Sequence, residues 1–169
     1  MSYMKKSLLL SLLGGLVLFG CGVYSFSGSG LPSHIRTVAV PVFDNQTAEY
    51  GIKENLSDQV IDALVTDGKL KVVQERDADS VVEGTVVEYQ NRAYTFDNSE
   101  NVQEYIVRIW VRVAYQDVRN RKAIWEEERM EGWGTYDVSI DPPEDEELGR
   151  ERAIAKLAED IVDKVVAGW

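Results

Sequence analysis

Residues 105–116 read YIVRIWVRVAYQ, and apolar side chains occupy every odd-numbered position of this run. Side chains on one face of a β-strand recur with a period of two, so the spacing predicts a long strand whose odd-numbered face lies in the core. The opposite face carries Arg108, Trp110 and Arg112, side chains of mixed character. One face of the resulting sheet is therefore expected to be buried and the other to stay open.

Two further strands flank this run, over residues 81–96 before it and 123–136 after it. Turn-forming residues separate the three strands at 97–99 and at 117–122, which predicts an antiparallel meander. The strand over 81–96 is expected to place Val82, Gly84 and Val86 on one face and Val81, Thr85, Val87 and Tyr89 on the other.

The amino-terminal half of the domain predicts a βαβ unit. A β-branched run over 35–43 contains a proline that cannot donate a ladder hydrogen bond, and a loop is expected at 44–47. Apolar residues then recur at helical spacing over 50–66, and Asp67-Gly68 supplies a helix stop. A short strand over 70–74 completes the unit, so the two strands are expected to be parallel.

The carboxy-terminal segment predicts a second amphipathic helix. Acidic residues at 144–147 open it, where the helix dipole favours negative charge, and an apolar stripe runs from Ile154 to Val166. The order β-α-β-β-β-β-α predicts an α+β fold, a two-layer sandwich in which a mixed four- to five-stranded sheet carries both helices on one face. We expect a single domain over residues 35–169.

The first 20 residues predict a signal peptide that is removed. Lys5 and Lys6 precede an apolar run over 8–19, which is shorter than the roughly 20 residues that a membrane-spanning helix needs. The segment Leu18-Phe19-Gly20-Cys21 resembles the lipobox of bacterial lipoproteins, whose cysteine receives a diacylglyceryl group and, as the new N-terminus, an N-acyl chain. We therefore expect Cys21 to be lipidated; an ordinary secretory signal with an incidental cysteine is the alternative.

Residues 21–34 are rich in glycine and serine and predict a flexible tether between lipid and domain. A short docked strand around Tyr24 is the alternative. By resemblance to enterobacterial sorting, Gly22 in place of an aspartate after the cysteine favours the outer membrane. His34, at the end of the tether, is expected to be solvated.

The charge balance excludes several partners. The whole chain of 169 residues carries a formal charge of −11, and removal of residues 1–20, which hold two lysines and no acid, takes it to −13. Binding to nucleic acid depends on a basic surface that neutralises phosphates, so no nucleic-acid partner is expected. The same balance argues against a polybasic membrane-surface protein.

The residues of common catalytic centres are scarce. Cys21 is the only cysteine and His34 the only histidine, so Ser–His and Cys–His nucleophile pairs and zinc sites lack partners. Carboxylates are plentiful, but no pattern in the sequence brings two of them together in a cleft. We expect no enzyme activity, no metal and no cofactor beyond the lipid on Cys21.

The open face of the sheet is the most informative candidate surface. If Asn120-Arg121 form the turn centre, Arg119 pairs with Lys122. This register places Trp125, Glu127, Arg129, Glu131 and Trp133 on the same face as Arg108, Trp110 and Arg112. Tryptophan and arginine are enriched at the centres of protein interfaces, so Trp110, Trp125 and Trp133 are candidate interface residues. The alternative is a small hydrophobic cluster on a solvated sheet face.

Several segments carry a family resemblance in the order in which they occur. They are CGVYSF (21–26), LPSHIRTVAVP (31–41), TDGKLKVV (66–73), VEGTV (82–86), WEE (125–127) and the terminal Gly168-Trp169. Together they resemble the LPS-assembly lipoprotein family, LptE. The resemblance implies a non-enzymatic outer-membrane lipoprotein on the periplasmic face, held in the inner leaflet by its lipid. Such a protein sits inside the β-barrel translocon LptD and helps to deliver lipopolysaccharide; the family fold is the sandwich described above.

Lipopolysaccharide is anionic, so its contact with this acidic chain needs a local cationic cluster. The densest cluster is Arg119, Arg121 and Lys122 at the hairpin turn, and Arg108 and Arg112 on the strand are further candidates. Ordinary solubilising charge is the alternative for the turn. A second hypothesis for the whole protein is a lipoprotein subunit of another envelope secretion machine, of the curli-export or Tol type.

Overall fold

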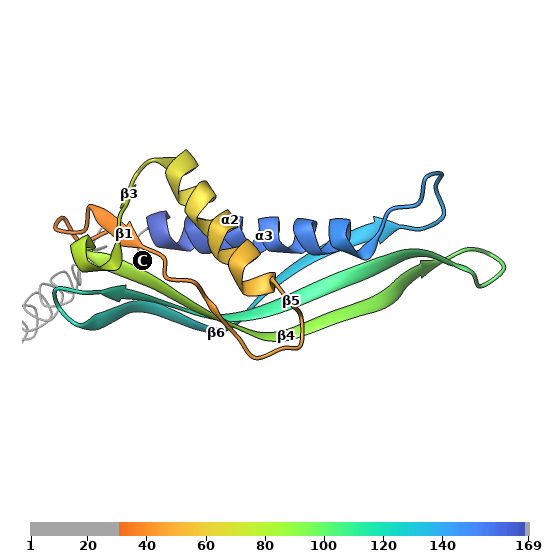
Figure 1. The fold of residues 1–169 in the computed structure, drawn as a ribbon, viewed down its shortest axis with the longest axis horizontal. Coiled ribbons are helices and arrows are strands. Elements are labelled where there is room, and N and C mark those ends of the chain that lie inside the picture. Colours follow the sequence, from red (N-terminus) through yellow and green to blue (C-terminus); the bar gives the residue numbers. More distant parts are fainter. Residues whose placement is uncertain (1–30, 168–169) are drawn as a thin grey trace, which may run out of the picture.

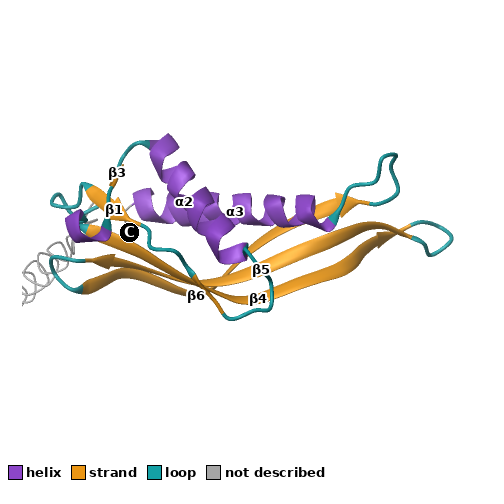
Figure 2. Cartoon of the chain, in the orientation of Figure 1, coloured by secondary structure: helices purple, strands orange, loops and turns teal. Residues whose placement is uncertain are grey.

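Two helices lie on one face of a mixed β-sheet, the α+β sandwich that the sequence predicts (Figures 1 and 2). The structure, a computed structural model, describes residues 31–167. Its elements are β1 Thr37–Ala39, β2 Asp44–Asn45, α2 Ile52–Asp67, β3 Lys71–Val72, the 3₁₀ turn η2 Glu75–Asp77, β4 Ser80–Phe96, β5 Val102–Asp117, β6 Lys122–Asp137 and α3 Glu146–Ala167.

The sheet runs in the order β3-β1-β4-β5-β6. β1 pairs in parallel with both β3 and β4, which confirms the predicted parallel βαβ unit, and β4, β5 and β6 form the predicted antiparallel meander. A sixth strand, β2, lies where the sequence predicts a loop. Its two residues pair in parallel with β4, and the next backbone amide, of Gln46, donates to the carbonyl of Val86 at 2.9 Å.

Helix α2 forms because its apolar side chains recur every fourth residue and face the sheet. Leu56, Val60 and Leu64 are at most 1% exposed. The helix ends at the predicted stop, where Gly68 adopts a left-handed φ of 71° and its amide donates to the carbonyl of Leu64 at 3.1 Å. This conformation suits glycine, which has no Cβ to clash with the backbone.

Helix α3 packs closely on β6. A Cβ placed on Gly132 would lie 2.3 Å from Cγ of Leu157 and 2.4 Å from the carbonyl oxygen of Ala153. Only a residue without a side chain fits at this position, so Gly132 sets the distance between the helix and the strand. The buried side chains of α3 fill the rest of this layer and include Ile154, Leu157, Ile161 and Val165.

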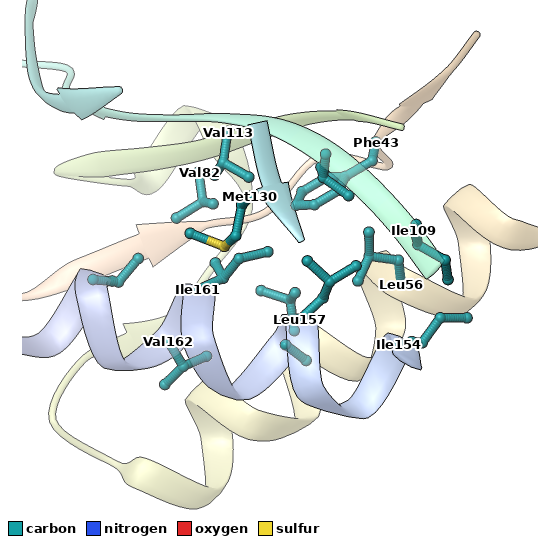
Figure 3. Packing of buried hydrophobic residues seen from close by; sticks show 14 of the residues in the cluster. Phe43, Leu56, Val82, Ile109, Val113, Met130, Ile154, Leu157, Ile161 and Val162 are labelled. Atoms are coloured by element: carbon teal, nitrogen blue, oxygen red, sulfur yellow. The ribbon is translucent and has the colours of Figure 1, made fainter. Parts of the chain in front are cut away.

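The core lies between the sheet and the two helices. The odd-numbered residues of β5 supply its centre as predicted, since Val107, Ile109, Val111, Val113 and Tyr115 have no exposed surface. Figure 3 shows Ile109 and Val113 on the sheet with Leu56 of α2 and Leu157 and Ile161 of α3 in the same buried cluster.

A bulge in β4 overturns the predicted placement of Tyr89. The pairing with β5 shifts between Val86 and Glu88, so the alternation of faces changes at Val87. Beyond the bulge Tyr89 pairs with Ile109 and lies on the helix side of the sheet. Its hydroxyl donates to Oε1 of Glu146 in α3 at 2.6 Å, and burial together with this carboxylate raises the pKa of Tyr89 far above its usual value.

Candidate functional site

The sheet face turned away from the helices carries the side chains that the sequence singles out. In β5 the even-numbered residues Arg108, Trp110 and Arg112 lie opposite the core-facing row. Figure 1 shows that α2 and α3 cover only the other face of the sheet. The face formed by these residues and their neighbours in β4 and β6 is called the open face below.

The predicted pairing of Arg119 with Lys122 is wrong. Lys122 pairs with Asp117, and the register between β5 and β6 shifts twice, between Tyr115 and Gln116 and between Val111 and Val113. A bulge adds one residue to one strand and so exchanges the faces beyond it. Together the two shifts move the pairing by two residues, so the pairing beyond Val111 has the predicted register, with Trp110 opposite Glu131 and Arg108 opposite Trp133.

Trp125 lies between the two bulges and therefore on the helix side of the sheet. It pairs with Tyr115, and the two ring centroids are 6.1 Å apart. Nζ of Lys164 in α3 lies 5.6 Å from the centre of the Trp125 ring and 2.7 Å from a carboxylate oxygen of Glu127. Trp125 and Glu127 thus pack against α3 and do not belong to the open face, contrary to the sequence-based expectation.

Trp110 lies on the open face, but a neighbouring arginine covers it. The guanidinium of Arg129 lies 4.7 Å from the centre of the indole ring and donates to a Glu88 carboxylate oxygen at 2.5 Å. This hydrogen bond lowers the pKa of Glu88. Because only 7% of Trp110 is exposed, the residue stabilises the sheet more than it offers a contact surface.

The strand arginines proposed for lipopolysaccharide contact already have carboxylate partners. Arg108 lies 3.5 Å from Glu131, and Arg112 lies 3.9 Å from Glu128. Both pairs are partly exposed, so each is weak and screened by salt. The positive charge of these two arginines is nevertheless balanced locally.

A hollow of about 280 Å³ lies further along the open face and contains the exposed Trp133. Its lining consists of Tyr94, Ile106, Arg108, Glu131 and Trp133. Tyr94 and Trp133 are each about half exposed, whereas Ile106 is buried. Sequence reasoning missed Tyr94, because the bulge at Val87 moves the even-numbered residues of β4 beyond it to the open face, where Arg92 pairs with Ile106. The β4 alternation taken alone therefore did not reveal its place beside Trp133.

The β5–β6 turn presents Arg119, Arg121 and Lys122 to solvent and is called the basic turn below. Arg121 has a φ of 52°, a left-handed conformation that is uncommon outside glycine. Asp117 fixes the turn, because its carboxylate accepts hydrogen bonds from the backbone amide of Asn120 at 2.9 Å and from its side chain at 2.8 Å.

His34 also contacts Asp117 and is not simply solvated. Its Nε2 lies 2.7 Å from a carboxylate oxygen of Asp117, and Leu31 packs against the hydrophobic core. Burial of Asp117 opposes its ionisation, but the hydrogen bonds from Asn120 and His34 outweigh that effect and lower its pKa. The end of the segment expected as a tether therefore contacts the domain beside the basic turn.

The lipidation candidate Cys21 lies outside the described residues. Within residues 31–167 no group of three or more potential metal ligands occurs, and no helix is long and apolar enough to cross a membrane.

The model of the family described as LptE, Lipopolysaccharide-assembly, matches residues 35–167. A search of curated proteins found no match.

Several solved structures are similar in fold. A hypothetical protein from Chlamydia trachomatis has 14% identity and a TM-score of 0.57, with 76% of this chain and 94% of that chain covered. A protein from Xanthomonas campestris has 12% identity and a TM-score of 0.56 over 80% and 86% of the two chains. A minor lipoprotein from Acinetobacter baumannii has 20% identity and a TM-score of 0.50 over 80% and 93%. At these identities the likeness extends to the fold alone.

Proposed function

Because the chain belongs to the lipopolysaccharide-assembly family LptE, we propose that it is an outer-membrane lipoprotein that associates with and plugs an LptD-type β-barrel. In this role it assists the delivery of lipopolysaccharide and catalyses no reaction. The observation that carries the proposal is the family match over residues 35–167, which spans both helices and the whole sheet.

The open face supports association with a protein partner. Trp133 and Tyr94 are half-exposed aromatic side chains around a shallow hollow, and Arg108 and Glu131 lie beside them. Exposed tryptophan and tyrosine with flanking charged groups are typical of interface centres. Trp133 is therefore the proposed barrel contact. Trp110 supports the surface from below Arg129, and Trp125 belongs to the packing of α3.

The basic turn is the proposed contact for lipopolysaccharide phosphates. Among the described residues, no ion pair or hydrogen bond involves the side chains of Arg119, Arg121 and Lys122, whereas Arg108 and Arg112 are paired with glutamates. An unpaired exposed cation retains its charge for an incoming anion, so the turn is the stronger candidate of the two groups.

The anchor of the proposed lipoprotein is Cys21. Its place after a short apolar run supports lipidation, and Gly22 after it supports sorting to the outer membrane. The lipid would hold the domain at the periplasmic face of that membrane, beside the barrel.

Affinity purification of the tagged chain from native membranes tests the central proposal. We expect a large β-barrel protein to co-purify, and recovery without one would overturn the proposal. Depletion of the protein separates this function from a subunit of a curli-export or Tol-type machine, because only the proposed function predicts loss of surface lipopolysaccharide.

Charge reversal tests the turn. Arg119→Glu, Arg121→Glu and Lys122→Glu together should weaken binding of purified lipopolysaccharide and leave the barrel association intact. Lys53→Glu, Arg92→Glu and Lys156→Glu form a control with the same change in net charge at sites away from the turn. Equal loss in both triple variants would remove the turn from consideration.

A further inference from the structure

Most cationic side chains of this acidic protein are neutralised by neighbours, but a minority are not. Within residues 31–167, ten lysines and arginines form ion pairs with carboxylates, and six do not. The six are Arg36, Lys71, Arg92, Arg119, Arg121 and Lys122. The net charge of the whole chain conceals this division.

The sheet register brings five of these six to one end of the molecule. Lys71 pairs with Thr37, next to Arg36, and Val38 pairs with Ser80. Ser80 pairs with Asp117, and Asp117 with Lys122. One end of the sheet thus carries Lys71, Arg36, Arg119, Arg121 and Lys122 on the ends of strands β3, β1, β5 and β6; we call it the basic end.

The carboxylates of the basic end are mostly engaged. Asp67 lies 3.5 Å from Lys69, and Asp77 lies 3.4 Å from Arg76. Asp79 accepts hydrogen bonds from the backbone amides of Arg36 and Thr37 and from the Thr37 hydroxyl, at 2.9 to 3.1 Å. Asp117 is buried and bonded to His34 and Asn120, which leaves Glu75 as an exposed carboxylate outside these pairs.

The described chain also enters the domain at the basic end. The contact of His34 with Asp117 holds the entry point one residue away from the turn. Leu31 follows Cys21 by ten positions, and an extended chain of ten steps spans at most about 35 Å. A lipid on Cys21 would therefore keep the basic end close to the membrane surface.

We propose that the basic end docks on anionic phospholipid headgroups of the leaflet that holds the Cys21 lipid. This inference rests on the lipid anchor of the proposed function. The cations lie on four strands that span the five-strand width from β3 to β6, roughly 19 Å at the usual strand spacing. This width suits a plane of many headgroups better than one phosphate, and Val118, 44% exposed beside Arg119, adds an apolar contact.

Docking through this end fixes the orientation of the domain. Figure 1 shows the β5–β6 turn and the first described residues at one end of the long axis, and the β4–β5 hairpin at the other. The acidic residues around the start of α3, Glu144 to Glu147, lie toward that far end. Docking through the basic end therefore keeps them away from the anionic membrane surface, which would repel them. The open-face hollow with Trp133 would then be held away from the lipid.

Site-directed spin labelling of the full lipidated chain tests the proposal. Because Cys21 is the only cysteine and would carry the lipid, Val118→Cys supplies a single free thiol for a nitroxide. The protein is reconstituted in phosphatidylcholine vesicles that contain phosphatidylglycerol, lipopolysaccharide or neither. The accessibility of the label to oxygen and to a water-soluble nickel complex reports its depth. A label at Ile140→Cys, in the loop before α3, is the far-end control.

We expect the label at residue 118 to move to the headgroup region only when phosphatidylglycerol is present, and the label at residue 140 to stay in water. Arg119→Gln, Arg121→Gln and Lys122→Gln together should lower the ratio of docked to free domains about 100-fold, since each basic side chain near an anionic surface contributes a factor of about five. Lys53→Gln, Arg92→Gln and Lys156→Gln, with the same loss of charge, should leave that ratio unchanged.

Two results would overturn the docking. One is a label at residue 118 that stays in water in both vesicles; the other is docking that needs lipopolysaccharide in the vesicle and ignores phosphatidylglycerol. Mass spectrometry of the same sample reports the lipid on Cys21 separately. An unmodified Cys21 overturns the anchor and this proposal with it, whereas lipidated protein with a water-exposed label overturns the docking alone.

Discussion

Nε2 of His34 lies 2.7 Å from a carboxylate oxygen of Asp117, a contact between residues 83 positions apart that joins the start of the described chain to the end of β5. The same carboxylate binds the β5–β6 turn through Asn120. Asp117 therefore holds together the two features that define the basic end, the entry of the chain and the cationic turn.

Asp117→Asn should destabilise the protein by about 1–3 kcal/mol at neutral pH, the usual loss when a buried charged acceptor of hydrogen bonds is removed. The pKa of Asp117 is lowered in the folded state. Its ionised form thus contributes stability above the unfolded-state pKa of about 3.9, and that contribution is lost as pH falls through the folded-state value. Urea unfolding at several pH values should show the difference between the two proteins begin to shrink as pH falls below about 4.

Asp62→Asn is the matched control for this prediction, because Asp62 is exposed on α2. As a surface substitution it should change the free energy of unfolding by less than about 0.5 kcal/mol. A difference between wild type and Asp117→Asn that stays constant down to acidic pH would contradict the assigned role of the carboxylate.

Gly132→Ala should destabilise the protein by about 1–3 kcal/mol, because the new methyl group would overlap Leu157 and the backbone of α3. Gly68→Ala is a useful contrast. Nothing lies within 4 Å of a Cβ there, so only the left-handed φ opposes the change, at a cost of about 1 kcal/mol. Thermal unfolding compares the two, and a Gly132→Ala protein as stable as wild type would show that α3 can move away from β6.

Trp133→Ala should reduce barrel association but not stability, whereas Trp125→Ala should reduce stability but not barrel association. Trp133 is half exposed on the open face, so its removal should reduce co-purification of the barrel and barely change the unfolding free energy. Trp125 packs against Tyr115 and Lys164, so its removal should cost roughly 2 kcal/mol, about half of what a fully buried aromatic contributes. Equal recovery of the barrel with both variants would remove Trp133 from the proposed interface.

The strict alternation in β5 and the spacing of apolar residues in both helices made the sandwich predictable. Each of these signals is local: a period of two or of about four residues depends only on the segment itself. Val107 to Tyr115 are buried as the alternation requires, and α2 ends at the expected Asp67-Gly68.

The details that failed depend on bulges and on pairing between distant segments. One extra residue reverses the face of everything beyond it, and no residue type in β4 or β6 marks where the bulge occurs; Tyr89 and Trp125 were misplaced for this reason. Arg36 and Lys71 join the turn only through the parallel register of β1 and β3. The order of charged residues in the sequence does not show how β1 and β3 pair, so the sequence alone did not reveal the basic end.

Cys21→Ala should release the protein from the membrane without changing its fold. The described core is built from residues of the domain itself, and a lipid on Cys21 would add no packing to it. Density-gradient fractionation of cells should find the variant outside the outer-membrane fraction, and its circular dichroism and melting temperature should equal those of the wild type. Gly22→Asp is the control, because it keeps the cysteine and, by resemblance to enterobacterial sorting, should redirect lipidated protein to the inner membrane. Retention of Cys21→Ala in the outer membrane would contradict the anchor, and an unfolded variant would contradict the separation of anchoring from folding.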